Sequence, residues 1–193
     1  MLTQRIADNE RGEQTTLPLS AVIDENKVAI SQLLDLLTTL PDDLYRRPIG
    51  ARGQHFLGKH IRHIIDHYDT FFTVLEDPLH RPLNYDARAR EPGLERNPAV
   101  AIKRLNSLCD ALNKLQTAHQ DRLVNLDCVC DQGVTTLTSS LGRELMFLSS
   151  HCIHHMAIIG LLVEQNGGQV GAQFGVHPAT LRHQRNLQSA ATA

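Results

Sequence analysis

The chain has 193 residues, of which 41% are hydrophobic, and its 19 basic and 21 acidic side chains give a net charge of −2. This length fits one domain with its own core, and a nearly neutral chain without a long basic run argues against nucleic acid as a partner. No stretch reaches the about 18 consecutive apolar residues of a transmembrane helix, so we expect no membrane partner.

The start of the chain and its cysteines indicate the compartment. The first ten residues are polar and lack the apolar segment of a signal peptide. Cys109, Cys128, Cys130 and Cys152 do not have the spacing of a disulfide framework or a zinc knuckle. We therefore expect a cytoplasmic location and reduced thiols that are mostly buried.

Two amphipathic helices are predicted in the first part of the chain. Residues 1–17 are polar and are expected to form an extension, followed by a domain over 18–170. Apolar residues recur every three or four positions over Ser20–Leu40, which predicts the first helix. The same period over Gly53–Leu75 predicts the second helix.

A long loop is predicted after the second helix, which Asp77 and Pro78 end. The loop covers Leu79–Asn97 and carries several charges, and loops of this length in compact domains are usually functional or disordered. The third helix is predicted over Pro98–Val124, where an apolar stripe returns, with Asn97 as its N-cap.

The pattern then changes from the helical period to alternation. Alternating residues over Cys128–Thr138 predict a short hairpin. Ser139 or Ser140 is expected to cap the fourth helix, which Gly167 ends. Residues 171–193 are a C-terminal tail without a clear period.

Four long amphipathic helices are typical of an all-α protein. The sequence thus predicts a four-helix bundle with a long loop between the second and third helices and a short hairpin before the fourth. Bundles of this kind commonly hold metal ions between facing helices.

Six of the eleven histidines lie in two short stretches of the second and fourth helices. Three of them, at i, i+3 and i+7, form one stripe on the second helix (His60, His63, His67). On the fourth helix, His151 and His155 are four residues apart and share a face, with His154 about 60° to the side. An i, i+4 pair presents two nitrogens to one ion, so we predict both as metal ligands, with a third from the stripe.

These motifs resemble the DinB-like superfamily of four-helix-bundle proteins. The resemblance covers about residues 20–170 and includes the words Gly142-Arg143-Glu144-Leu145 and Asn84-Tyr85-Asp86-Ala87-Arg88-Ala89-Arg90. It implies a divalent metal ion bound by one histidine of the second helix and by the His-x-x-x-His of the last helix, which here are His63, His151 and His155. The other three histidines (His60, His67, His154) are then alternative ligands or neighbours of the ligands.

Three imidazoles leave an open coordination position on Zn²⁺, Ni²⁺ or Fe²⁺. This chemistry suits a metal-dependent enzyme acting on a small-molecule substrate, and the resemblance favours a hydrolase or a thiol transferase over redox work. The alternative is a non-catalytic metal-binding or stress-response protein in which the ion is structural. In either case the sequence leaves open whether the protein forms a homodimer through an exposed helix face.

Further residues are candidates for the site. Glu144 lies two turns before His151 and is a catalytic candidate, as a general base or a hydrogen-bond partner of a ligand, unless it is only a partly exposed charge favoured by the helix dipole. Four loop residues are expected to cover the site and bind an anionic substrate, unless they are ordinary loop charge (Tyr85, Asp86, Arg88, Arg90). Asp66 points away from the stripe, and we expect it to be solvated and paired with Lys59 or Arg62.

Overall fold

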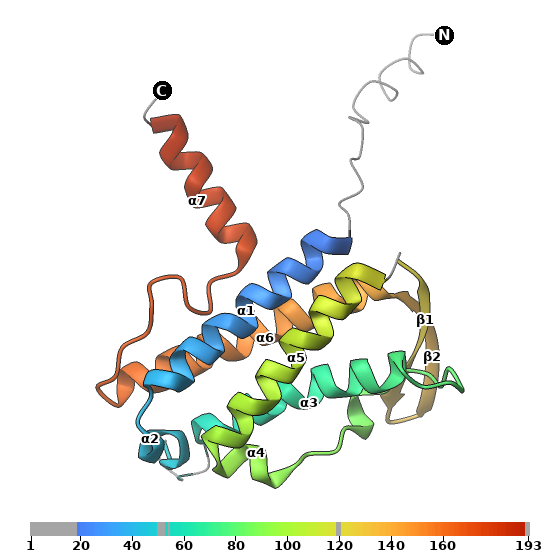
Figure 1. Cartoon of the computed structure of the whole chain (residues 1–193), viewed down its shortest axis with the longest axis horizontal. Coiled ribbons are helices and arrows are strands. Elements are labelled where there is room, and N and C mark those ends of the chain that lie inside the picture. Colours follow the sequence, from blue (N-terminus) through green and yellow to red (C-terminus); the bar gives the residue numbers. More distant parts are fainter. Residues whose placement is uncertain (1–18, 50–52, 54, 119–120, 192–193) are drawn as a thin grey trace.

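The computed structural model describes residues 19–49, 53, 55–118 and 121–191, so the predicted extension over 1–17 lies outside the described residues. The described part is predominantly helical, with seven α-helices, one 3₁₀ helix and one two-stranded sheet (Figure 1). The prediction of a helical protein with one hairpin is therefore confirmed at this level.

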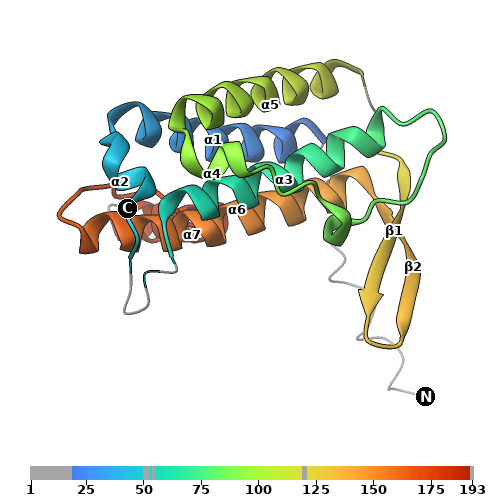
Figure 2. The ribbon, with the colours of Figure 1, turned by 90° about the horizontal axis from the view of Figure 1, so that it is seen from below.

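Four long helices form the body of the protein: α1 (Leu19–Thr39), α3 (Leu57–Leu75), α5 (Pro98–Ala118) and α6 (Leu141–Gln165). Both α1 and α3 contact α5 and α6, so each long helix has two long neighbours (Figures 1 and 2). Their apolar faces meet in one core that includes Ile30, Leu33, Ile61, Ile65, Leu105, Leu112, Leu145 and Cys152. The second predicted helix begins at Leu57 and not at Gly53, while its end at Leu75 is as predicted.

A buried polar side chain sets α1, α3 and α6 in register. Asn26 is fully buried in α1, and its Nδ2 donates hydrogen bonds to the carbonyls of Val22 at 2.8 Å and Leu145 at 3.0 Å. Its Oδ1 accepts a hydrogen bond from the Tyr68 hydroxyl at 2.6 Å. Because buried polar groups are costly when left unpaired, this arrangement favours one alignment of α3 against α6.

Two short helices at one end of the body were not predicted: α2 (Asp42–Arg46) and α4 (Pro92–Arg96). The Tyr45 hydroxyl of α2 donates to the carbonyl of Leu94 in α4. Gly58 of α3 allows α4 to pack closely, because a Cβ at this position would lie 2.0 Å from the Glu95 carbonyl oxygen. The predicted long loop is thus partly helical and anchored at this end.

The hairpin is longer than predicted. Its strands, β1 (Leu123–Cys130) and β2 (Gly133–Ser140), pair antiparallel along their whole length. The third long helix ends at Ala118, so the predicted end at Val124 is wrong. Leu123 and Val124 fit a helical stripe in sequence, but they pair with Ser140 and Ser139 across the hairpin. Ser140 caps α6, as predicted, by accepting a hydrogen bond from the Arg143 amide at 3.3 Å.

The C-terminal tail contains a further helix, α7 (Pro178–Ala191), which extends away from the four long helices (Figure 1). It is mostly exposed, and Arg182 joins it to Glu25 of α1 at 2.6 Å. All four cysteines are free, as predicted, but only Cys152 is buried.

The helix α6 is long and apolar enough to cross a membrane by length and composition alone. The core helix of a folded domain passes the same test, and 44% of the apolar window of α6 is buried within the protein. The absence of a membrane partner therefore stays a prediction.

Candidate metal centre

The packing of α3 against α6 brings three of the predicted histidines together. His63, His151 and His155 each offer a ring nitrogen, and these nitrogens all lie within 4.8 Å of one another. The ring centroids are 4.5 Å apart for His63 and His155, and 4.6 Å apart for His151 and His155. We call these three residues the histidine cluster. A single ion between the rings is the arrangement that the i, i+4 pair and His63 led us to expect.

The chemical state of the histidine cluster suits a metal ion. Burial lowers the pKa of His63 to about 3, His151 to about 4 and His155 to about 3, with the neighbouring histidines adding to the effect. The rings are therefore neutral at pH 7, which is the form that binds metal. The Nε2 atom of His151 is buried and has no hydrogen-bond partner among the described residues. Such an atom is costly unless a ligand satisfies it.

The other three histidines surround the cluster. The Nδ1 atoms of His60 and His155 are 3.1 Å apart, so one of these rings donates to the other. His67 is buried and donates from Nδ1 to the His63 carbonyl at 2.7 Å, which leaves only its Nε2 for another partner. His154 is exposed, and its ring lies edge-on to that of His155 with the centroids 5.2 Å apart.

Glu144 is fully buried, which excludes the interpretation of a partly exposed charge. One carboxylate oxygen accepts a hydrogen bond from the Tyr85 hydroxyl at 3.0 Å, and the other accepts from the Ser139 hydroxyl at 2.5 Å. Within the described part of the chain, no histidine is hydrogen-bonded to Glu144. Glu144 therefore reaches the histidines through Tyr85, whose ring stacks on His67 with the centroids 5.3 Å apart.

Of the four predicted loop residues, Tyr85 stacks on a histidine, Arg88 lines a neighbouring cavity, and the other two are exposed. Tyr85 and Arg88 are half-buried, and the Arg88 guanidinium contributes to lowering the pKa values of His63 and His151. Asp86 and Arg90 are exposed. The Arg90 side chain donates at 3.2 Å to the Asp86 carbonyl, and therefore folds back on its own segment.

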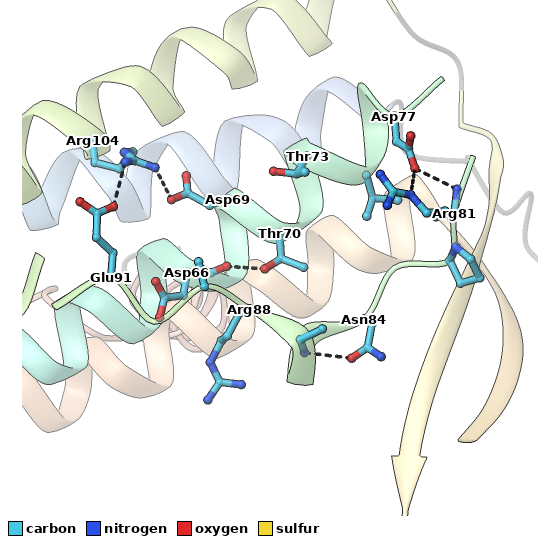
Figure 3. A pocket seen from close by; sticks show the side chains of 14 residues that line it. Asp66, Asp69, Thr70, Thr73, Asp77, Arg81, Asn84, Arg88, Glu91 and Arg104 are labelled. Atoms are coloured by element: carbon cyan, nitrogen blue, oxygen red, sulfur yellow. Dashed lines mark hydrogen bonds and ion pairs between the residues drawn. The ribbon is translucent and has the colours of Figure 1, made fainter. Parts of the chain in front are cut away.

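A cavity of about 460 Å³ lies on a different face of α3 (Figure 3). It is lined by α3, by the segment from Arg81 to Glu91 and by Arg104, and no histidine borders it. Asp66 on its wall is 3% exposed, so the prediction of a solvated carboxylate is wrong, although its predicted pairing with Arg62, at 3.2 Å, is found. The loop packs over this face of α3, which the sequence pattern does not reveal.

Comparison with known proteins gave two matches. The model of the DinB family matches residues 14–178. A curated protein, FK506-binding protein 5 of Rhizopus delemar, is 32% identical over 104 residues, which are 52% of this chain and 27% of that protein. The chain thus aligns with about a quarter of the length of this relative. No solved structure matched.

Proposed function

Because this chain belongs to the DinB family, we propose that it binds one divalent ion, Zn²⁺, Ni²⁺ or Fe²⁺, and is a metal-dependent enzyme of the hydrolase or thiol-transferase type. The ligands are those of the histidine cluster (His63, His151, His155). The observation that supports this most is the convergence of three neutral imidazoles within 4.8 Å from two helices. Three nitrogen ligands leave an open position on such an ion, as catalytic zinc sites do.

We also propose that α1, α3, α5 and α6 form a four-helix bundle, with the metal site at the contact between α3 and α6. The pairwise contacts of these helices and their common core support this architecture. Rigid helices hold ligands more accurately than loops do, which suits a site that must keep one coordination position open.

The bound ion would act as a Lewis acid that polarises a carbonyl group or lowers the pKa of water or a thiol. The protein residues then have separate roles. His67 supports His63 through its hydrogen bond to the His63 carbonyl. Glu144 holds the Tyr85 hydroxyl, and burial and the Glu144 carboxylate both raise the pKa of Tyr85. Tyr85 thus stays protonated and can donate a hydrogen bond. We propose that Glu144 takes part in catalysis through Tyr85, by holding its hydroxyl.

The alternative is a structural ion without catalysis. It is favoured by the position of the ligands, since an ion held by α3 and α6 joins segments that are far apart in the sequence. A fourth protein ligand would close the site, and His60 or His67 is near enough to the cluster rings to be considered, at centroid distances of 5.4 Å and 4.3 Å. An open site with an exchangeable ligand would favour the enzyme.

The test is the metal content of protein purified without an affinity tag and then incubated with each of the three ions. We expect close to one equivalent per chain, and a value near zero for all three ions would refute the proposal. A screen with thiol-adduct, ester and amide substrates follows for the enzyme. A cytoplasmic location, a small-molecule substrate and the absence of nucleic-acid partners stay predictions, and a homodimer stays open.

A further inference from the structure

The segment 83–88 is fixed in place beside the histidine cluster. At its start, Leu83 pairs with β1: its amide donates to the Asn125 carbonyl at 2.8 Å, and its carbonyl accepts from the Asp127 amide at 2.8 Å. Asn84 then caps the 3₁₀ helix η1 (Tyr85–Ala87) through its side-chain oxygen. Together with the hydrogen bond from Tyr85 to Glu144, these contacts preorganise the side chains of the segment for binding a ligand.

Arg88 ends this segment with part of its hydrogen-bonding capacity unused. Its Nη1 donates to the Tyr85 carbonyl at 2.9 Å. Its Nε is buried and has no partner among the residues that the structure describes, and Nη2 donates to none of them either. The remaining Nε–H and Nη2–H point side by side along one edge of the guanidinium, which is the edge that binds two oxygens of one anion.

Three neighbouring arginines are different, because each is already paired with a carboxylate, whereas Arg90 is exposed and donates only to backbone carbonyls. Arg62, Arg81 and Arg104 each bind a carboxylate at 3.2 Å or less. No carboxylate in the described part of the chain forms an ion pair with Arg88, and its guanidinium points away from the acidic side chains of the cavity (Figure 3). Burial is the largest cause that lowers the pKa of Arg88, and Asp66 and Asp86 offset the lowering only in part, so the cation is incompletely compensated and its burial is costly. A ligand that supplies the anion removes this cost.

We propose that Arg88 binds a carboxylate of the substrate through Nε–H and Nη2–H, beside the open position at the histidine cluster. This inference rests on the proposed function and adds the substrate class: a small carboxylate whose reactive thiol, ester or amide reaches the metal. The position of Arg88 agrees with this, since the Tyr85 carbonyl that accepts its hydrogen bond belongs to the residue whose ring stacks on His67.

The test uses Co²⁺-loaded protein, whose absorption reports thiol binding without turnover, and two probes that differ only in charge: mercaptoacetate and mercaptoacetamide. Arg88→Gln should lower the affinity for mercaptoacetate by about 10- to 100-fold, as expected for the loss of a hydrogen bond to a charged group. The affinity for mercaptoacetamide should fall by less than about twofold. The matched control is Arg96→Gln, which removes a positive charge from the exposed face of α4 and should change neither affinity. Equal changes for both probes, or none, would overturn the role of Arg88.

A second measurement separates this inference from the metal site. In metal-free protein, the NMR signal of the Arg88 Nε–H, assigned by its loss in Arg88→Gln, is followed during titration with acetate or inorganic phosphate. We expect a saturable shift with acetate. If Co²⁺ does not bind but acetate shifts the signal, the proposed function fails and the anion site stands. A shift with phosphate alone would overturn the carboxylate as the ligand and indicate a phosphate group in its place. No shift with either anion would refute the site.

Discussion

Loading the histidine cluster with metal should raise the melting temperature. A ligand bound only by the folded state stabilises it by about 2.7 kcal/mol at a hundredfold excess over the dissociation constant. For a domain of this size, each kcal/mol of added unfolding free energy raises the melting temperature by roughly 2–4 °C. We therefore expect metal-free protein to melt about 5–10 °C below Zn²⁺-loaded protein at pH 7.5.

The metal-free protein should also lose stability as the pH falls below 6.5. The folded-state pKa values of the cluster are about 3, 4 and 3, whereas an unfolded histidine has a pKa of about 6.5. Below pH 6.5 the unfolded state binds more protons, so acid favours unfolding until the pH reaches the folded values, and the loss is complete near pH 3. At pH 5.5 each ring lowers the free energy of unfolding by about 1.4 kcal/mol, which gives about 4 kcal/mol for the three rings. Because the rings are partly exposed, we expect a total loss of about 2 kcal/mol.

The assay is a set of thermal melts of metal-free and Zn²⁺-loaded protein at pH 7.5 and 5.5. Since the cluster stays neutral in the folded state down to about pH 4, the increment from zinc should persist at pH 5.5 while both melting temperatures decrease. The control is His183→Ala, because His183 is exposed on α7 and should behave as the wild type does. Equal melting temperatures with and without zinc at pH 7.5 would show that the cluster consists of ordinary core histidines.

Three further predictions concern single residues. Alanine at any member of the histidine cluster should abolish metal binding in elemental analysis, because each substitution removes one of the three ligands. His154→Ala should keep about one equivalent of metal, because His154 is not a ligand. Equal losses of metal in all variants would refute the ligand assignment. Glu144→Gln should keep the metal and lose most turnover, with about 1–3 kcal/mol of unfolding free energy lost in urea because the buried hydroxyl of Tyr85 loses its charged acceptor; full activity would remove Glu144 from the mechanism. Gly58→Ala should cost at least about 1–3 kcal/mol in the same assay, because its Cβ would lie 2.0 Å from the backbone oxygen of Glu95; unchanged stability would mean that α4 is not held against α3 as described.

Local periodicity was sufficient for the four long helices and for the shared face of His151 and His155, but not for α2, α4 and α7. Both depend on the rotation of 100° per residue within one helix, which requires no knowledge of the rest of the chain. The same argument failed at Leu123, where a helical spacing was continued into a strand. There the outcome depends on pairing with Ser140, and pairing across a hairpin is a competing interaction that the helical pattern does not contain.

Helical spacing alone predicted the residue types of the candidate site: a histidine pair on one helix and a stripe of three candidates on another. It did not determine which of the three would meet the pair, because that depends on the rotation of α3 about its axis against α6. In the tertiary structure the ring nitrogen of His63 lies with those of the pair, while His60 contacts His155 and His67 donates to the carbonyl of His63. The assignment of His63 as the third ligand stays a prediction. The burial of Glu144, the burial of Asp66 and the unpaired edge of Arg88 were likewise decided by tertiary packing, because each depends on where a distant segment lies against the helices, which neither charge nor periodicity encodes.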